Sequence, residues 1–213
     1  MLMPFTSRMY AMSTSTRKPY HHGQLRLALL EAGREVLRRE GPAGLALRAV
    51  AGRAGVSPAA PYRHFRSAEH FTAVLAADGF RRLGDRLQEI ADRTTLTEVD
   101  RLRAMAWPYL ALPAEEPALY RLMFEGLIAD RRQYPELVAA ERRAEELLAR
   151  VVNTAYAAGR ISVADPADAL LTMRCAVYGL GRLVVDGRLT VAEAEPSLRR
   201  VMAVVEQGLL PRP

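Results

Sequence analysis

The segment from Leu47 to Phe65 constrains the fold of this chain more than any other, because it combines two short helical stretches with one tight turn. Gly55 can adopt the left-handed conformation that such a turn requires, and Ser57 followed by Pro58 is a favourable helix start. The second stretch, about Pro58 to Phe65, begins with small side chains and has no acidic residue. A slender helix of this kind fits the major groove of DNA, so the segment indicates a helix-turn-helix. An αα-hairpin that never touches DNA is the alternative.

The rest of the chain has apolar residues at helical spacing and almost no strand-like alternation. This pattern predicts an all-α fold with about nine helices. Glycine and proline supply the expected breaks, at Gly41-Pro42, Pro113, Gly126, Gly159 and Gly187. Beside the helices at 47–54 and 58–65, we expect helices over 24–39, 68–92, 99–112, 115–128, 135–158, 166–186 and 191–210.

The helix expected over 68–92 is long enough to connect two regions of the molecule, and Ser67 can cap its start. We therefore expect three parts in the chain. Residues 1–19 form a disordered arm, residues 20–66 form the helix-turn-helix domain, and residues 67–213 form a helical body.

Basic residues are concentrated in the N-terminal third of the sequence. The chain of 213 residues has a net charge of +6, but residues 1–66 carry 11 Lys and Arg against 3 acidic residues, and the rest carries 19 against 21. This asymmetry favours a polyanionic partner at one end of the molecule. Taken alone, the charge asymmetry would be explained equally well by a solvated basic face.

The composition argues against several other classes of protein. Cys175 is the only cysteine, so no disulfide can form within one chain, and we expect a cytoplasmic location. No apolar run approaches the roughly 18 residues that a membrane span needs. We expect Cys175 to be buried as a small hydrophobic residue.

The sequence offers little for catalysis or metal binding. His21-His22 has no further cysteine or histidine near it, which argues against a zinc site. The carboxylate pairs lie at expected helix starts or on exposed faces, where the helix dipole or solvation explains them. They are Glu115-Glu116, Glu145-Glu146 and Asp165 with Asp168. We expect no enzyme activity, no metal and no cofactor.

The sequence from Tyr20 to Phe71 resembles the N-terminal DNA-binding domain of TetR-family transcriptional regulators. The family's mark is a valine-serine pair followed by a short helix that ends in tyrosine-x-histidine-phenylalanine, here Val56-Ser57 and Tyr62-Arg63-His64-Phe65. The segments PAEEPALYRLMFEG and YGLGRLVVDGRL also resemble one large subgroup of that family.

The resemblance implies roles for the matched positions. Tyr62 and His64 would bind phosphate oxygens, while Phe65 would belong to the core. Small side chains in the second helix leave part of the specificity to DNA shape. Where the family usually places a phosphate-binding lysine, this chain has Ser67-Ala68-Glu69, and Arg66 would substitute. The expected DNA contacts are Arg17, Lys18, Arg48, Ser57, Ala59, Ala60, Tyr62, Arg63, His64 and Arg66.

Large, pliable side chains on several middle helices can converge to line an apolar pocket. Simple core packing is the alternative for each of them. The family's regulatory logic implies a pocket in this body, and its ligand would be a small, mostly apolar molecule. The candidate pocket residues are Met105, Trp107, Tyr109, Tyr120, Met123, Phe124, Tyr156 and Met173.

The last two helices carry small and apolar residues that fit an intermolecular four-helix bundle. Packing within the chain is the alternative. A homodimer is favoured because one recognition helix buries little surface, and a dimer reads two half-sites. The candidate interface residues are Tyr178, Gly179, Leu183, Leu198, Val201, Met202 and Val205.

The sequence therefore predicts a ligand-responsive, homodimeric transcriptional regulator of the TetR type. We expect a repressor that binds a palindromic operator in double-stranded DNA and is released by the effector, with no membrane partner. A ligand-insensitive DNA-binding protein is the first alternative. An all-α enzyme with its active site in the body is the second.

Overall fold

A computed structural model describes residues 22–209 of the chain. Within this range the fold is all-α, as predicted, and contains eight α-helices and three short 3-10 turns. The α-helices are α1 (His22–Glu40), α2 (Leu47–Arg53), α3 (Ala68–Ala91), α4 (Glu98–Glu115), α5 (Pro117–Phe124), α6 (Pro135–Ala157), α7 (Pro166–Val185) and α8 (Val191–Leu209). The 3-10 turns are η1 (Pro42–Gly44), η2 (Pro61–Arg63) and η3 (Arg131–Gln133).

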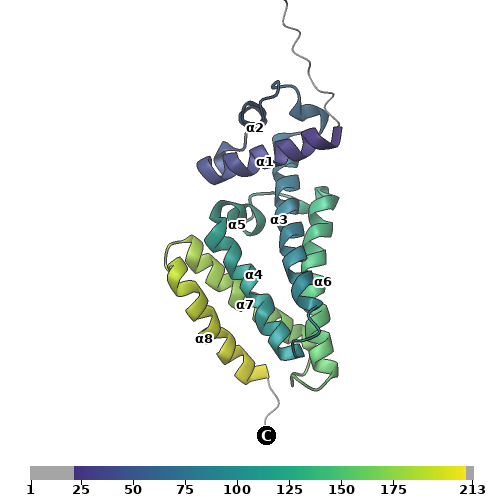
Figure 1. Cartoon of the computed structure of the whole chain (residues 1–213), viewed down its shortest axis with the longest axis vertical. Coiled ribbons are helices and arrows are strands. Elements are labelled where there is room, and N and C mark those ends of the chain that lie inside the picture. The colour runs from purple at the N-terminus through teal and green to yellow at the C-terminus, as the bar shows by residue number, and fades with distance from the viewer. Residues whose placement is uncertain (1–21, 210–213) are drawn as a thin grey trace, which may run out of the picture.

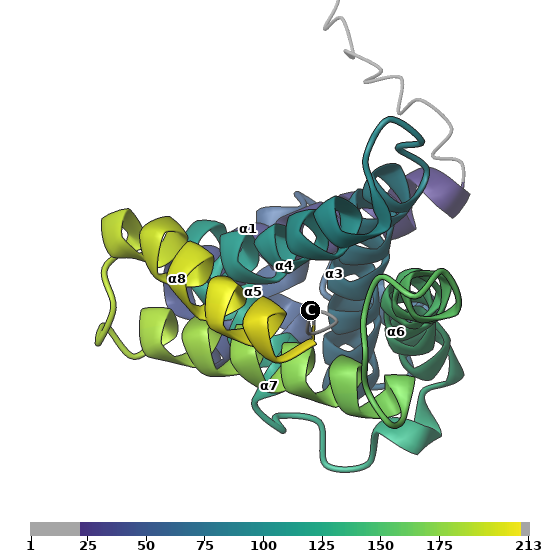
Figure 2. The same ribbon diagram turned by 90° about the horizontal axis from the view of Figure 1, so that it is seen from below.

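The helices form a small N-terminal unit on top of a larger bundle (Figure 1). Helices α1 and α2 lie at one end, and α3 runs from them down through the body beside α6, its most extensive packing partner. On the other side α4 packs against α7, and both contact α8 (Figure 2). None of the described helices is long and apolar enough to cross a membrane.

The first turns of α3 join the N-terminal unit to the body. The Ser67 side chain accepts a hydrogen bond from the His70 backbone N–H at 3.0 Å and so caps α3, as predicted. The buried Phe71 ring packs against α1 so closely that a Cβ on Gly33 would lie 2.4 Å from it. Arg34 of α1 pairs with Asp78 of α3 at 2.7 Å. Packing and a partly buried ion pair therefore fix α1 against α3.

The prediction of an α-helix over Pro58–Phe65 is wrong. This segment consists of turns and the 3-10 turn η2, which is why eight α-helices replace the expected nine. Most of its backbone bonds span three residues, as from Ala60 N–H to Ser57 O and from His64 N–H to Pro61 O, both at 2.9 Å, and a single four-residue bond joins Phe65 N–H to Pro61 O at 2.9 Å. Two prolines remove amide donors from a stretch this short, so the α-helical ladder never forms.

The expected break at Pro113 is also wrong. Pro108 and Pro113 both lie inside α4 and are buried there. The helix ends where Glu116 N–H donates to Leu112 O at 2.8 Å, and α5 starts directly afterwards at Pro117. Burial of the apolar rings within the bundle offsets the lost backbone bonds.

The turn after α2 has the geometry that the sequence predicts. Gly55 has a φ of 67°, and its N–H donates to Gly52 O while Val56 N–H donates to Ala51 O. This is the Schellman arrangement of helix ends, which places a residue in the left-handed region. Ala51 is fully buried at the helix crossing.

We expect Gly55→Ala to destabilise the chain by about 1–2 kcal/mol, because alanine is disfavoured in the left-handed region. Gly52→Ala is the matched control, since Gly52 lies inside α2 and a Cβ added there would have no neighbour within 4 Å. It should stabilise the chain by about 0.5–1 kcal/mol. Urea unfolding of both variants measures the difference, and equal effects would contradict this account of the turn.

Candidate functional site

The segment 57–66 presents polar and cationic side chains outward and buries two apolar ones. Tyr62 is 62% exposed, and Arg63 is also exposed. Pro61 and Phe65 are buried, and the Phe65 ring meets Phe71 edge-on at 4.8 Å. The predicted core role of Phe65 is confirmed. Two buried anchors thus hold a segment that lacks the regular hydrogen bonding of an α-helix.

The structure brings most of the predicted DNA-contact residues to the surface of this unit. Ala60 and His64 are half-buried, whereas the others in the described range are exposed. Arg17 and Lys18 lie outside the described residues. The exposed ones are Arg48, Ser57, Ala59, Tyr62, Arg63 and Arg66.

The basic side chains of the N-terminal unit divide into paired and unpaired groups. Glu35 forms ion pairs with Arg38, Arg39 and Arg53, and its pKa is lowered chiefly by the hydrogen bond from Arg38. Among the residues described, by contrast, Arg48, Arg63 and Arg66 form no ion pair with a carboxylate. These three exposed guanidinium groups are available to phosphates.

His70 is a positioning residue that the sequence reasoning missed. Its Nδ1 accepts a hydrogen bond from the Arg66 backbone N–H at 3.0 Å, and its ring stacks on Tyr134 at 6.1 Å. Burial, followed by the positive charge of Arg66, lowers the pKa of His70. The neutral ring is the form that can accept this bond, so the lowered pKa maintains the link between segment 57–66 and the loop before α6. A histidine three residues after a helix cap was the only signal in the sequence.

A small cavity marks the contact between the N-terminal unit and the body, and ion pairs within the body fix α3 to the junction of α4 and α5. Arg82 of α3 pairs with Glu116 at 2.7 Å, and Arg86 pairs with Glu115 at 3.0 Å. Between α1 and α5 lies a cavity of about 210 Å³, which both polar and apolar side chains line. It is lined by Glu31, Arg34, Glu35, Leu37, Arg38, Glu116, Pro117, Ala118 and Leu119. Helix α5 therefore lies against α1, in addition to α3.

An aromatic cluster occupies the centre of the body. The Phe124 ring contacts the rings of Tyr120 at 4.9 Å, Tyr178 at 5.1 Å and Phe80 at 5.2 Å. Tyr178 in turn lies 5.9 Å from Tyr109. Burial raises the pKa of Tyr120 to about 12 and that of Tyr109 further, so both hydroxyls stay protonated. Four helices contribute to this cluster, which joins three of the predicted pocket residues.

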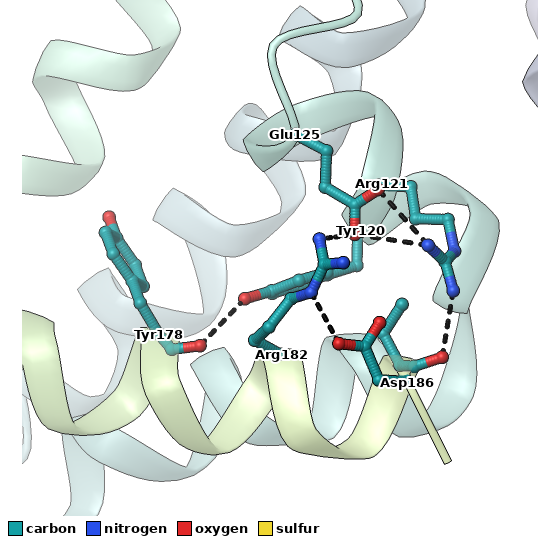
Figure 3. A network of polar contacts seen from close by, with 7 residues as sticks. Tyr120, Arg121, Glu125, Tyr178, Arg182 and Asp186 are labelled. Carbon is teal, nitrogen blue, oxygen red and sulfur yellow. Dashed lines mark hydrogen bonds and ion pairs between the residues drawn. The ribbon is translucent and has the colours of Figure 1, made fainter. Parts of the chain in front are cut away.

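A polar network fixes α5 against the C-terminal half of α7 (Figure 3). The Tyr120 hydroxyl donates to Tyr178 O at 3.2 Å, and Arg121 donates to Val185 O at 2.9 Å. Arg182 pairs with Glu125 and Asp186, both at 2.8 Å. Because a Cβ on Gly181 would lie 2.8 Å from the Tyr120 hydroxyl, the small residue there serves packing within the chain.

The remaining predicted pocket residues lie elsewhere. Met105 and Met123 are fully buried core residues, and Met173 lines a small cavity of about 20 Å³ between α4, α7 and α8. Trp107 and Tyr156 are exposed, on α4 and α6. Trp107 lies in a surface groove beside Leu198 and Met202. These residues share no single site, since helical spacing does not determine which face meets the centre of the bundle.

The predicted dimer residues also divide between the core and the surface. Leu198 and Met202 are buried within the chain, Tyr178 belongs to the aromatic cluster, and Val201 and Val205 pack against the core. Gly179 and Leu183 are exposed, together with Leu171 and Val204, which the sequence reasoning missed.

The expectation that Cys175 is buried is wrong. Cys175 is exposed on α7. It shares the helical stripe of Leu171, Gly179 and Leu183, each four residues from the next. Its surroundings in the chain therefore form an unpartnered apolar face rather than a core.

Metal-ligating side chains do not cluster in the described part of the chain. Within residues 22–209, no group of three or more His, Cys, Asp or Glu side chains is placed to hold a metal ion. His21 and the side chain of His22 lie outside the part that the structure describes.

Comparison with solved structures gives close fold matches. A protein of unknown function from Rhodococcus sp. RHA1 is 31% identical over 91% of this chain and 100% of its own, with a TM-score of 0.80. FadR from Bacillus subtilis, in complex with stearoyl-CoA, is 16% identical over 85% of this chain and 98% of its own, with a TM-score of 0.72. The ketosteroid regulator KstR2 of Mycobacterium tuberculosis is 20% identical over 88% and 95%, with a TM-score of 0.65. The last two show the fold alone.

Family models match both parts of the sequence, whereas comparison with curated proteins gives no match. Residues 29–71 match the model described as bacterial regulatory proteins of the tetR family. Residues 102–205 match the model described as the tetracyclin repressor-like C-terminal domain. The chain belongs to the TetR family of transcriptional regulators.

Proposed function

We propose that this regulator binds a palindromic DNA operator as a homodimer, acts as a repressor and is released by a small, mostly apolar effector. The observation that carries the proposal is the exposed segment 57–66, anchored by buried Pro61 and Phe65 and accompanied by three arginines without carboxylate partners among the residues described. In this proposal the chain divides into an arm over 1–19, a DNA-binding unit over 20–66 and an effector-binding body over 67–213.

The proposed contacts follow from exposure. Arg48, Arg63 and Arg66 meet phosphates or guanine edges, since guanidinium groups are suited to both. Tyr62 and Ser57 add hydrogen bonds to the sugar-phosphate backbone of the DNA. Ala59 can contact only methyl groups, so a share of specificity comes from DNA shape.

The proposed effector site is the aromatic cluster in the body. Its rings come from α3, α4, α5 and α7, so a molecule inserted between them would displace helices relative to one another. Helix α5 lies against α1, and α3 continues into the DNA-binding unit. Effector affinity must differ between the two arrangements for release to occur. That FadR was solved with stearoyl-CoA supports an apolar ligand in this fold.

Arg63→Ala should weaken binding to a selected operator by about 1–3 kcal/mol, because it removes one guanidinium from the DNA surface. Arg132→Ala is the control, since Arg132 is 90% exposed on η3 in the body. Fluorescence anisotropy with duplexes enriched from a random pool measures both. The salt dependence should also be less steep in Arg63→Ala.

Equal affinities of the two variants would contradict the proposed DNA surface. The same assay separates the alternatives. An operator complex that no small molecule dissociates would identify a ligand-insensitive DNA-binding protein. Turnover by the body with no DNA binding even at low salt would identify an enzyme.

Leu183→Glu should convert a dimer to a monomer, because it places a charge on the exposed stripe of α7 that we propose meets a second copy. Tyr156→Glu is matched in exposure, at 40% against 38% for Leu183, but lies on α6. Sedimentation equilibrium compares the two with the unmodified chain. A Leu183→Glu variant that stays dimeric, or an unmodified chain that is monomeric, would contradict this interface.

A further inference from the structure

Two arginines cover opposite ends of an arc of aromatic rings in the body. The guanidinium carbon of Arg131 lies 5.5 Å from the Phe80 ring centre, and that of Arg174 lies 5.7 Å from the Tyr178 ring centre. Phe124 sits between the two rings, at 5.2 Å from Phe80 and 5.1 Å from Tyr178. Each cation is therefore held over the negative face of a ring at one end of the arc.

Two glutamates on one face of α6 hold these arginines. Glu141 lies 3.3 Å from Arg131, and Glu145 lies 2.8 Å from Arg174. The glutamates are four residues apart, which places them on adjacent turns of the same helix face. Their side chains are 35% and 37% exposed, so each carboxylate can move to solvent at little cost.

Arg131 has hydrogen-bonding capacity that its protein neighbours leave unused. Its Nη1 donates to Met123 O at 2.8 Å, but Nε and Nη2 are buried and make no hydrogen bond among the described residues. The Glu141 carboxylate is close to Nη2 without hydrogen-bond geometry. Two buried guanidinium donors without an acceptor are unfavourable, and an added acceptor would relieve this.

We propose that this arrangement is a recognition site for a carboxylate group on an apolar molecule. The carboxylate replaces Glu141 beside Arg131 and accepts from Nε and Nη2 in the paired geometry that a guanidinium favours. The apolar part lies against Phe80, Phe124 and Tyr178. The unused groups are donors and both glutamates already have partners, so the site selects an anion rather than a cation.

The inference deepens the proposed function, because it names the chemical class of the effector at the aromatic cluster. It also connects effector binding structurally to the DNA-binding unit. The Arg131 guanidinium joins the end of α5, through Met123 O, to the face of Phe80 on α3. A carboxylate that reorients Arg131 therefore acts on the helix that lies against α1 and on the helix that continues into the DNA-binding unit.

The test compares three probes with one alkyl chain: decanoate, 1-decanol and decylamine. Isothermal titration calorimetry on the full chain should give about tenfold or tighter binding for decanoate than for either other probe, the size expected for a charge-assisted hydrogen bond. Arg131→Gln should abolish this preference, because it removes the guanidinium that distinguishes decanoate from the other two probes. Arg132→Gln, one residue further on and highly exposed, should behave like the unmodified chain.

Glu141→Gln provides the decisive comparison. It removes the competing carboxylate, so decanoate should bind more tightly than to the unmodified chain. A purely structural ion pair predicts that Arg131→Gln and Glu141→Gln weaken binding alike, and that result would overturn the proposal. Equal binding of the three probes, or preference for decylamine, would also overturn it. Circular dichroism melting checks that each variant is folded. Arg131→Lys is a second variant at this position, and it retains the charge.

Operator binding is measured on the same samples. Operator binding with no preference for decanoate refutes the carboxylate site and leaves the regulator intact. Selective decanoate binding by a chain that ignores all duplexes refutes the proposed function and leaves the carboxylate site intact.

Discussion

The edge-to-face packing of Phe65 on Phe71 is the contact on which the DNA-facing surface depends. Segment 57–66 has no α-helical hydrogen-bond ladder to hold its shape, so its position is set by what it buries. Phe71 also fills the space beside Gly33, which fixes α1 to the start of α3. One buried ring thus aligns the recognition segment, the first helix and the connecting helix.

Local signals in the sequence predict the start of α3 and the turn after α2 well, but they predict segment 58–65 and the end of α4 badly. Ser67 as a cap and Gly55 as a left-handed turn act through their own backbone neighbours, so they can be read without the fold. Pro58 and Pro61 are each compatible with the first turn of an α-helix, yet together they favour 3-10 geometry. Pro113 resembles a breaker in the sequence because its burial within α4 depends on the surrounding helices.

The two candidate sites differ in how much of them could be predicted. The DNA-facing segment is contiguous, so its composition and the family resemblance identify it. The body site joins Phe80, Arg131, Glu141 and Tyr178 from four separate segments. Helical periodicity marks apolar residues as buried but does not say which of them meet, which is why Trp107 and Tyr156 are exposed although the sequence pattern placed them in the pocket. The sequence does not single out Arg131 as a site residue, because a charged residue in a loop is usually solvated.

Affinity cleavage locates segment 57–66 on bound DNA. An iron chelate attached to Ala59→Cys, in a chain with Cys175→Ser, cuts DNA wherever segment 57–66 lies. We expect cuts at two places on a selected operator, about one helical turn or 34 Å apart, symmetric about its centre. The same chelate at Arg142→Cys on α6 should give no localised cuts. Localised cutting from position 142, or none from position 59 on a bound duplex, would mean that segment 57–66 does not face the DNA.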